Sequence, residues 1–222
     1  MKIVSYNINS CTQEKVDFLL SLNADVYVVP EIACREKIYL PPEYNMEWKS
    51  DCPTKGLGLI WRKGKYEHAS FYNESLAYAI PIIYDGVLIL GFWPTKLKGE
   101  KKNYTQIAKD IINYYSPYFQ NYSKCIITGD FNLYHKENTP NKAADILEID
   151  NVLTNLGFHS VYHKWANEKL GYETRNTFFM RFKRDDPFFL DYTYSKFPVK
   201  EYYFIENPQY KFSDHIGQVI EI

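Results

Sequence analysis

The stretch ITGDFNLYH, residues 127–135, sets two polar side chains directly after an apolar strand. Asp130 and Asn132 are separated by a single phenylalanine, so a carboxylate and an amide can share one small ligand. The alternative is a tight turn, because Gly and Asp often interrupt strands and Asn tolerates unusual backbone angles. The stretch on its own fits both interpretations equally well.

Other predicted strands also end in polar residues that could do chemistry. Asn7 follows the first strand, Glu31 ends the second in VVPEI, and Asp214 and His215 precede the last strand in KFSDHIG. Asn7 could instead cap a turn, and Glu31 could be a solvated strand end. Taken singly, each of these residues is more easily explained by structure than by function.

Asp191 is harder to explain by structure alone. It lies in FFLDY among apolar and aromatic residues, and an ionised carboxylate costs several kcal/mol to bury unless it is paired. His215 is the candidate partner among the five histidines. We expect the other histidines to be surface or structural residues; these are His68, His135, His159 and His163.

Taken in chain order, these residues resemble the endonuclease/exonuclease/phosphatase superfamily. The resemblance rests on N-x-N after the first strand, PE after the second, GDFN, LDY and a terminal SDH, and it spans Asn7 to His215. The superfamily includes pancreatic deoxyribonuclease, abasic-site endonucleases, neutral sphingomyelinases and inositol-polyphosphate 5-phosphatases. The resemblance implies an α/β fold, a four-layered sandwich of two packed mixed β-sheets flanked by helices. It also implies phosphoester hydrolysis assisted by a divalent metal.

The resemblance assigns a metal-binding side to the site. Glu31 would be the principal ligand of Mg²⁺ or Mn²⁺, because a hard carboxylate oxygen suits a hard cation. Asp214 would support the metal side or a second ion. Asn7 would help to orient the metal site and a phosphate oxygen.

The resemblance assigns the reaction itself to four further residues. Asp130 would align and deprotonate the attacking water, and Asn132 would hold that water or a non-bridging oxygen. His215, kept protonated by Asp191, would place positive charge on the phosphate. A nearby carboxylate favours this, because it raises the pKa of an imidazole above its usual value of about 6.5.

One departure from the superfamily concerns the leaving group. Relatives usually place a His or Tyr at the end of the strand that here reads LILGFWPTK, often followed by an Asn. Phe92 or Trp93 stands at the first position and Thr95 near the second. Neither aromatic side chain can give a proton to a leaving oxygen, so metal, water or another residue must stabilise it. Asn9, where abasic-site enzymes carry a carboxylate, is a milder departure.

Composition excludes a protein that grips nucleic acid by overall charge. The net charge is −1 and the isoelectric point is near 6.5, whereas proteins that bind long nucleic acids by charge are usually basic. A local patch is the remaining route. Arginines near Phe178, Phe179 and Phe182 could form a substrate groove, although a solvated hairpin explains them slightly better. The candidate substrate-binding residues are Thr95, Arg175, Arg181 and Arg184.

Residues 1–222 are predicted to form one domain with alternating strands and helices. Helices are expected at residues 14–22, at 104–119 with a capping box of Asn103 and Gln106, and at 146–156 before Gly157. Strands are expected at residues 2–8, 25–31, 57–62 and 124–128, and at 77–92 folded at Asp85-Gly86. Four short strands are expected at residues 178–182, 188–194, 202–205 and 218–222.

Three functions remain open at this point. The first is a metal-dependent phosphodiesterase, a nuclease acting on DNA or less favourably on RNA. The second keeps the site but acts on a small phosphorylated metabolite or lipid headgroup. The third is a catalytically weakened protein that binds nucleic acid or a protein through the same cleft.

The sequence also suggests where the protein works. The four scattered cysteines indicate reduced thiols rather than disulfides or a zinc site. The N-terminus is apolar only briefly, so neither a signal peptide nor a membrane span is expected. We expect a cytoplasmic monomer without a protein partner.

Overall fold

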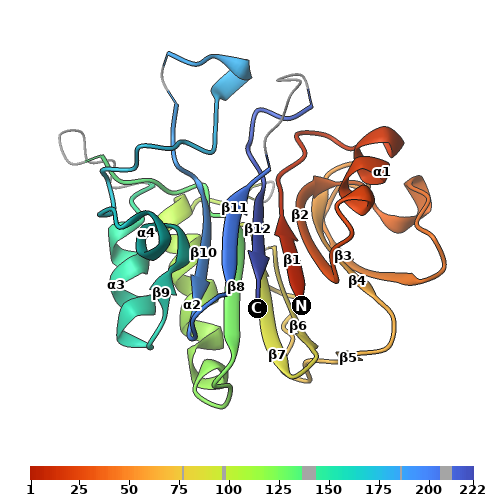
Figure 1. Cartoon of the computed structure of the whole chain (residues 1–222), viewed down its shortest axis with the longest axis horizontal. Helices are drawn as coiled ribbons and strands as arrows, with labels where there is room; N and C mark the ends of the chain where they lie inside the picture. The colour runs from red at the N-terminus through yellow and green to blue at the C-terminus, as the bar shows by residue number, and fades with distance from the viewer. Residues whose placement is uncertain (77, 97–98, 137–143, 186, 206–211) are drawn as a thin grey trace.

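Two six-stranded β-sheets form the centre of the molecule, with helices outside them (Figure 1). The computed structural model describes residues 1–76, 78–96, 99–136, 144–185, 187–205 and 212–222. The first sheet has the order β11 (Glu201–Phe204), β12 (Gln218–Glu221), β1 (Lys2–Ser5), β2 (Val26–Ile32), β4 (Gly56–Arg62), β3 (Tyr44–Lys49). The second has the order β5 (Tyr66–Glu67), β6 (Ala79–Tyr84), β7 (Val87–Phe92), β8 (Cys125–Asp130), β10 (Asp191–Ser195), β9 (His159–Ser160).

Both sheets are mixed, as predicted. In the first sheet β1 runs parallel to β2 and antiparallel to β12. In the second, β8 runs parallel to β7 and antiparallel to β10. The carboxyl ends of β1, β2 and β8 therefore come to one edge of the sandwich together with the start of β10. The predicted α/β sandwich is confirmed.

The strands of the first sheet are almost continuously apolar in sequence because they lie between two apolar cores. Ile3 and Val28 belong to the core between the two sheets. Val4 and Tyr27, their neighbours in sequence, belong to the core under α1 (Gln13–Ser21). Successive side chains of a strand point to opposite faces, so both faces of the first sheet are covered.

The helices begin and end where the sequence indicates. The Thr12 hydroxyl accepts a hydrogen bond from the Lys15 amide at the start of α1. α2 (Tyr104–Phe119) has the predicted capping box of Asn103 and Gln106. α3 (Leu147–Asn155) stops before Gly157, whose φ of +86° suits a residue without a side chain. The helices predicted at residues 14–22, 104–119 and 146–156 are therefore present, with each end within one residue of its predicted place.

The predicted strand at residues 178–182 is wrong. Met180–Phe182 forms a 3₁₀ turn, η2, in which Arg181 and Phe182 have positive φ angles. Only Phe178 makes an isolated bridge, to Phe188 and His215. The Phe182 amide donates to the Phe179 carbonyl at 2.7 Å, so a local turn replaces strand pairing.

The sequence patterns also missed several short elements. These are β3, β5, β9, the 3₁₀ turn η1 (Arg35–Lys37) and α4 (Val161–Ala166). Asp191 begins β10 instead of lying inside a strand at residues 188–194. Residue 77, the start of one predicted strand, lies outside the described residues, and β6 begins at Ala79.

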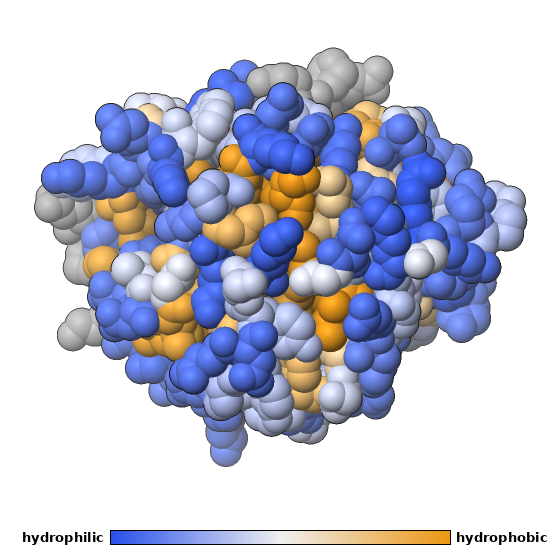
Figure 2. Space-filling model, turned by 60° about the horizontal axis from the view of Figure 1, so that its bottom comes forward, coloured by the Kyte–Doolittle hydropathy of each residue, from blue (hydrophilic) through white to orange (hydrophobic). Residues whose placement is uncertain are grey.

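The end of the molecule opposite the predicted site carries both termini (Figure 1). The Met1 ammonium donates to the Ile222 carbonyl at 2.8 Å. Apolar side chains lie through the middle of the face shown in Figure 2 and are interrupted by hydrophilic ones. Among the described residues, no helix combines the length and the apolar character that crossing a bilayer requires.

Gly129 allows β7 and β8 to approach closely, which gives a first prediction. A Cβ atom at this position would lie 1.9 Å from the Phe92 carbonyl oxygen, a severe clash with backbone. We expect Gly129→Ala to lower the free energy of unfolding by about 1–3 kcal/mol, measured by chemical denaturation. The control is Gly86→Asn, because position 86 has open space and Asn tolerates its φ of +74°. Equal stability of the two variants would contradict the close-approach argument.

Candidate active site

The predicted catalytic and metal-binding residues meet at the upper edge of the sandwich in Figure 1, at the carboxyl ends of β1, β2 and β8. Asp191 and Asp130 are direct partners in the antiparallel register of β10 and β8. Asp130 ends its strand and Asp191 begins its own. Sheet pairing therefore places two carboxylates side by side.

His215 lies between these two carboxylates. Its Nδ1 atom is 2.9 Å from Asp191 Oδ2, and its Nε2 atom is 3.9 Å from Asp130 Oδ2. All three residues are buried, with at most 5% of each exposed. The pairing of Asp191 with His215, predicted because a buried carboxylate needs a partner, is present in the structure.

The charges of this group shift its protonation. Burial lowers the pKa of His215, but the charges of Asp191 and Asp130 and the Asp191 hydrogen bond outweigh it and raise the pKa to about 9. Burial raises the pKa of Asp130 to about 6, although the His215 charge acts in the opposite direction. Near neutral pH the imidazole is therefore protonated and Asp130 is ionised.

Buried polar residues that the sequence patterns did not single out hold Asp191 in place. The Thr177 hydroxyl accepts hydrogen bonds from the Leu190 amide at 2.9 Å and the Asp191 amide at 3.0 Å. Gln218 Nε2 donates to the Asp191 carbonyl at 2.5 Å. Thr177 and Gln218 are both fully buried. A polar residue at the start of the apolar run QVI was the available signal for Gln218.

Ser213 connects the histidine to the first strand. Its hydroxyl accepts from the His215 amide at 3.0 Å and donates to the Asn7 carbonyl at 2.6 Å. Ser213 is two residues before His215, a spacing that favours a local side-chain turn. The SDH motif therefore supplies a positioning hydroxyl as well as its acid and imidazole.

Asn7 joins the Asp130 group to Glu31. Its Nδ2 atom donates to Asp130 Oδ2 at 2.9 Å and lies 3.5 Å from Glu31 Oε1. Its Oδ1 atom accepts from the Asn9 amide at 3.0 Å. Asn7 thus orients the carboxylates of Asp130 and Glu31. Its side-chain oxygen already accepts one hydrogen bond, from the Asn9 backbone N–H.

Two site residues have backbone angles that non-glycine residues rarely adopt. Glu31 has a φ of +66° and lies at a β-bulge, where the register shifts between Pro30 and Ile32. A bulge of this kind redirects a side chain out of the regular strand. Asn132 has a φ of +52°, and its backbone N–H donates to Asp130 Oδ1 at 2.9 Å. Such angles persist where surrounding contacts impose them, and they cluster at functional sites.

Asp214 lies on the Glu31 side of the cluster. Burial raises the pKa of its carboxyl, the His215 charge opposes the rise, and the Glu31 charge adds to it. Its backbone carbonyl accepts from the Phe179 amide at 2.8 Å. Glu31 and Asp214 therefore interact electrostatically across the edge of the first sheet.

Two groups of side chains could hold a cation. The oxygen donors of Glu31 and Asp214 fit Mg²⁺ or Mn²⁺, because both cations favour carboxylate ligands. Atoms of Asp130, Asp191 and His215 also lie within 4.8 Å of one another. His215 of that second group is protonated near neutral pH and so has no free nitrogen lone pair for a cation, which makes Glu31 and Asp214 the better ligands.

The residues at the predicted leaving-group position lie in the core. Phe92 is fully buried and its ring centroid is 4.5 Å from that of Phe131. Trp93 is buried against Tyr78, with 4.9 Å between ring centroids. Thr95 follows Pro94, whose carbonyl accepts from Asn132 Nδ2 at 3.4 Å. Thr95 is thus connected to the cluster only through Pro94, which bonds Asn132. Its role in substrate binding stays a prediction.

The predicted arginines do not lie together. The Arg175 guanidinium stacks on the Phe204 ring at 5.3 Å, against β11. Arg181 and Arg184 are exposed on the loop that carries η2, which projects beyond the site edge in Figure 1. Arg181 lines a hollow of about 260 Å³ with Lys183 and Phe188. Their role in substrate binding stays a prediction.

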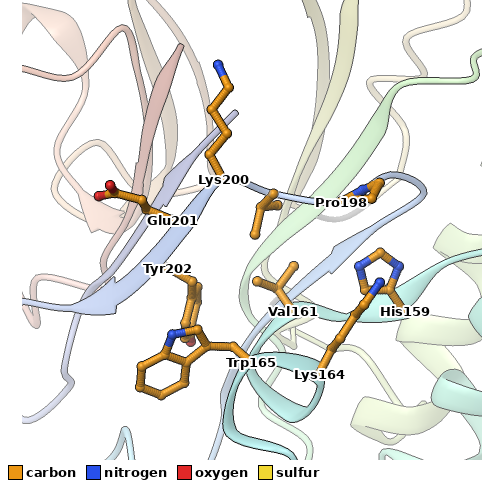
Figure 3. A pocket seen from close by; sticks show the side chains of 9 residues that line it. His159, Val161, Lys164, Trp165, Pro198, Lys200, Glu201 and Tyr202 are labelled. Atoms are coloured by element: carbon orange, nitrogen blue, oxygen red, sulfur yellow. The ribbon is translucent and has the colours of Figure 1, made fainter.

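A separate pocket of about 140 Å³ lies between α4 and β11 (Figure 3). Trp165 and Tyr202 form its aromatic side, and Lys164 and Lys200 are also among its lining residues. Its lining residues include none of the predicted site residues. The pocket is therefore distinct from the cluster around Asp130.

Solved structures with the same fold span the whole chain. A 3′ phosphatase, NExo, from Neisseria bound to a product DNA hairpin is 18% identical, with a TM-score of 0.73 and coverage of 100% of this chain and 99% of that one. An AP endonuclease from Archaeoglobus fulgidus is 18% identical, with a TM-score of 0.70 and coverage of 99% and 98%. The endonuclease domain of the non-LTR retrotransposon TRAS1 is 14% identical, with a TM-score of 0.66 and coverage of 100% and 97%.

These likenesses confirm the fold that the motif resemblance implied. No protein-family model matches the chain, and no curated protein sequence matches it. At identities of 14–18% the structures share the arrangement of the sheets.

Proposed function

We propose that this chain, which has the fold of a 3′ phosphatase and of two endonucleases, is a divalent-metal-dependent phosphodiester hydrolase. It acts on DNA, and less favourably on RNA, by attack of an activated water. The observation that carries the proposal is the buried series Asp191–His215–Asp130, which Asn7 connects to Glu31. A structural role alone does not require two carboxylates and an imidazole at one strand edge.

The cluster contains both a proton acceptor and a positive charge. Asp130 takes the proton of the attacking water, and Asn132 holds that water or a phosphate oxygen. His215, protonated beside Asp191, binds a phosphate oxygen and stabilises the added negative charge. A general base contributes a factor of about 10²–10⁴ in rate, and the full barrier demands on the order of 20 kcal/mol. The base therefore needs the charged groups around it.

Glu31 and Asp214 are the proposed ligands of Mg²⁺, with Mn²⁺ as a substitute. When bound, the cation supplies positive charge to the phosphate oxygens and the leaving oxygen. Asn7 keeps Glu31 oriented for this purpose through its Nδ2 atom. The backbone N–H of Asn9 donates to Asn7 Oδ1 and so fixes the orientation of the Asn7 side-chain amide.

DNA is the proposed substrate because three solved structures with this fold include one bound to DNA and two named as endonucleases. The exposed Arg181 and Arg184 lie on the projecting loop beside the site. With a net charge of −1, binding must rely on such local groups and on the metal. We also propose a cytoplasmic monomer, consistent with the four free cysteines.

A metal-dependent substrate screen tests this function. Purified protein should hydrolyse duplex or single-stranded DNA with Mg²⁺, more slowly cleave RNA, and lose activity when EDTA removes the metal. Cleavage products are measured on denaturing gels, with small phosphoesters assayed by phosphate release. Turnover of small phosphoesters without DNA cleavage would select a metabolite or headgroup phosphoesterase instead. DNA binding without turnover of any substrate would indicate a binding protein.

A further inference from the structure

Lys55 is a charged residue beside the site that no motif includes. Its Nζ atom lies 2.9 Å from Glu31 Oε1 and 5.9 Å from the centroid of the Trp93 ring. The Lys55 side chain is 50% exposed, whereas that of Glu31 is 15% exposed. The ammonium group therefore lies at the mouth of the site, between the proposed metal ligand Glu31 and the Phe92–Trp93 position, where no side chain can give up a proton.

The position of Lys55 is fixed both by the strand that follows it and by the loop that precedes it. On one side, Gly56 begins β4 and pairs with Ile32, directly after the bulge at Glu31. On the other side, the Lys55 amide donates to the Cys52 carbonyl at 3.2 Å, and the Cys34 amide donates to the Pro53 carbonyl at 3.0 Å. The loop before β4 is thus tied to the segment that follows Glu31.

A tyrosine links the same loop to the strand that ends at Phe92. The Tyr78 hydroxyl donates to Asp51 Oδ1 at 2.9 Å. Its ring packs on Trp93, and its carbonyl accepts from the Trp93 amide at 3.0 Å. These contacts place Lys55 next to the residue pair that occupies the usual donor position.

The distances around Glu31 put the ammonium within reach of a bound phosphate. Glu31 Oε1 is 3.5 Å from Asn7 Nδ2, which is 2.9 Å from Asp130 Oδ2. A lysine side chain is flexible, carries three donors and binds phosphate as a point charge. Lys55 and a divalent cation are also both partners for the same Glu31 carboxylate, so each weakens the binding of the other.

We propose that Lys55 has two roles in the reaction proposed above, on which this inference rests. It is the internal counter-ion of Glu31 and lowers the affinity of the site for a divalent cation. Released from Glu31, its ammonium binds the substrate phosphate on the side of the leaving oxygen, where neither Phe92 nor Trp93 has a proton that it can give up.

Lys55→Met tests the first role without any substrate, because it removes the charge and keeps the length of the side chain. We expect the substrate-free variant to bind Mn²⁺ about three- to tenfold more tightly in an isothermal titration. The matched control is Lys65→Met, which removes an exposed lysine paired with Asp85 at 2.7 Å on a remote hairpin. Its Mn²⁺ affinity should equal that of the wild type. Equal Mn²⁺ affinity of Lys55→Met and wild type would overturn the counter-ion role.

Equilibrium binding tests the second role without turnover. In an Asp130→Asn background with saturating Mn²⁺, Lys55→Met should weaken the binding of a fluorescent DNA duplex by tenfold or more. Lys55→Arg should retain most of the affinity, because it keeps the charge. Unchanged DNA affinity of Lys55→Met would overturn the phosphate role.

These binding measurements, taken together with the cleavage assay of the wild type, separate this inference from the proposed function. If the wild type cleaves no phosphodiester but both binding effects appear, the hydrolase proposal fails and the assignment of Lys55 stands. If the wild type cleaves DNA and neither binding effect appears, the hydrolase proposal stands and the assignment of Lys55 fails.

Discussion

Asp130→Asn is expected to lower kcat for phosphodiester hydrolysis by about 10³-fold, within the range for removal of a general base. The amide cannot take a proton from water, yet it has the shape of the carboxylate. Its oxygen can still accept from the Asn132 amide, which donates to Asp130 Oδ1 at 2.9 Å. The loss of activity should therefore appear in kcat, measured by single-turnover kinetics at saturating Mg²⁺.

Thermal unfolding separates a chemical effect from a structural one. Burial disfavours the ionised form of Asp130 and raises its pKa, but the new amide NH2 group meets the Asn7 Nδ2 donor that now bonds Asp130 Oδ2, so we expect Asp130→Asn to fold with a stability loss of at most about 1–3 kcal/mol. The control is Asp150→Asn, which changes an acid that accepts from the Tyr194 hydroxyl at 2.8 Å, outside the site. A similar loss of kcat in both variants would refute the assignment of Asp130 as the base.

A second large effect is expected in the pH profile of kcat/KM. In the wild type, activity should rise as pH increases through about 6, because Asp130 must lose its proton to act as a base. It should fall as pH increases through about 9, because His215 must keep its proton to bind phosphate. The expected profile is a plateau between these two limits.

Asp191→Asn should move the alkaline limit of this profile to lower pH. Without the Asp191 charge and its hydrogen bond, burial is opposed only by the charges of Asp130 and Asp214, so the pKa of His215 should fall below about 9. At pH 8 the protonated fraction, and with it kcat/KM, should then fall by about an order of magnitude. The acid limit should move little in comparison.

Glu173→Gln is the matched control, since Glu173 pairs with His163 Nε2 at 2.9 Å away from the cluster. Its pH profile should coincide with that of the wild type. An alkaline limit that stays near pH 9 in Asp191→Asn would show that Asp191 does not keep His215 charged.

Much of the architecture followed from local patterns. The capping box at Asn103, the helix stop before Gly157 and the hairpin at Asp85-Gly86 depend on neighbouring residues, and all three are present. The pairing of Asp191 with His215 was also predictable, because an ionised carboxylate among aromatic residues requires a partner. The failure at residues 178–182 has the opposite cause. An aromatic run there closes a local turn, since no strand among the described residues pairs with it beyond Phe178.

By itself the sequence determined which side chains could do chemistry, and in what order along the chain. The tertiary structure alone decided the distances, since Asn7, Glu31, Asp130 and His215 come from segments far apart in sequence. It also decided that Arg175 stacks on Phe204 and that Lys55 reaches Glu31. The physical reason is that hydrophobic patterns and caps act over a few residues, whereas charge pairing and backbone bulges depend on which strand lies alongside.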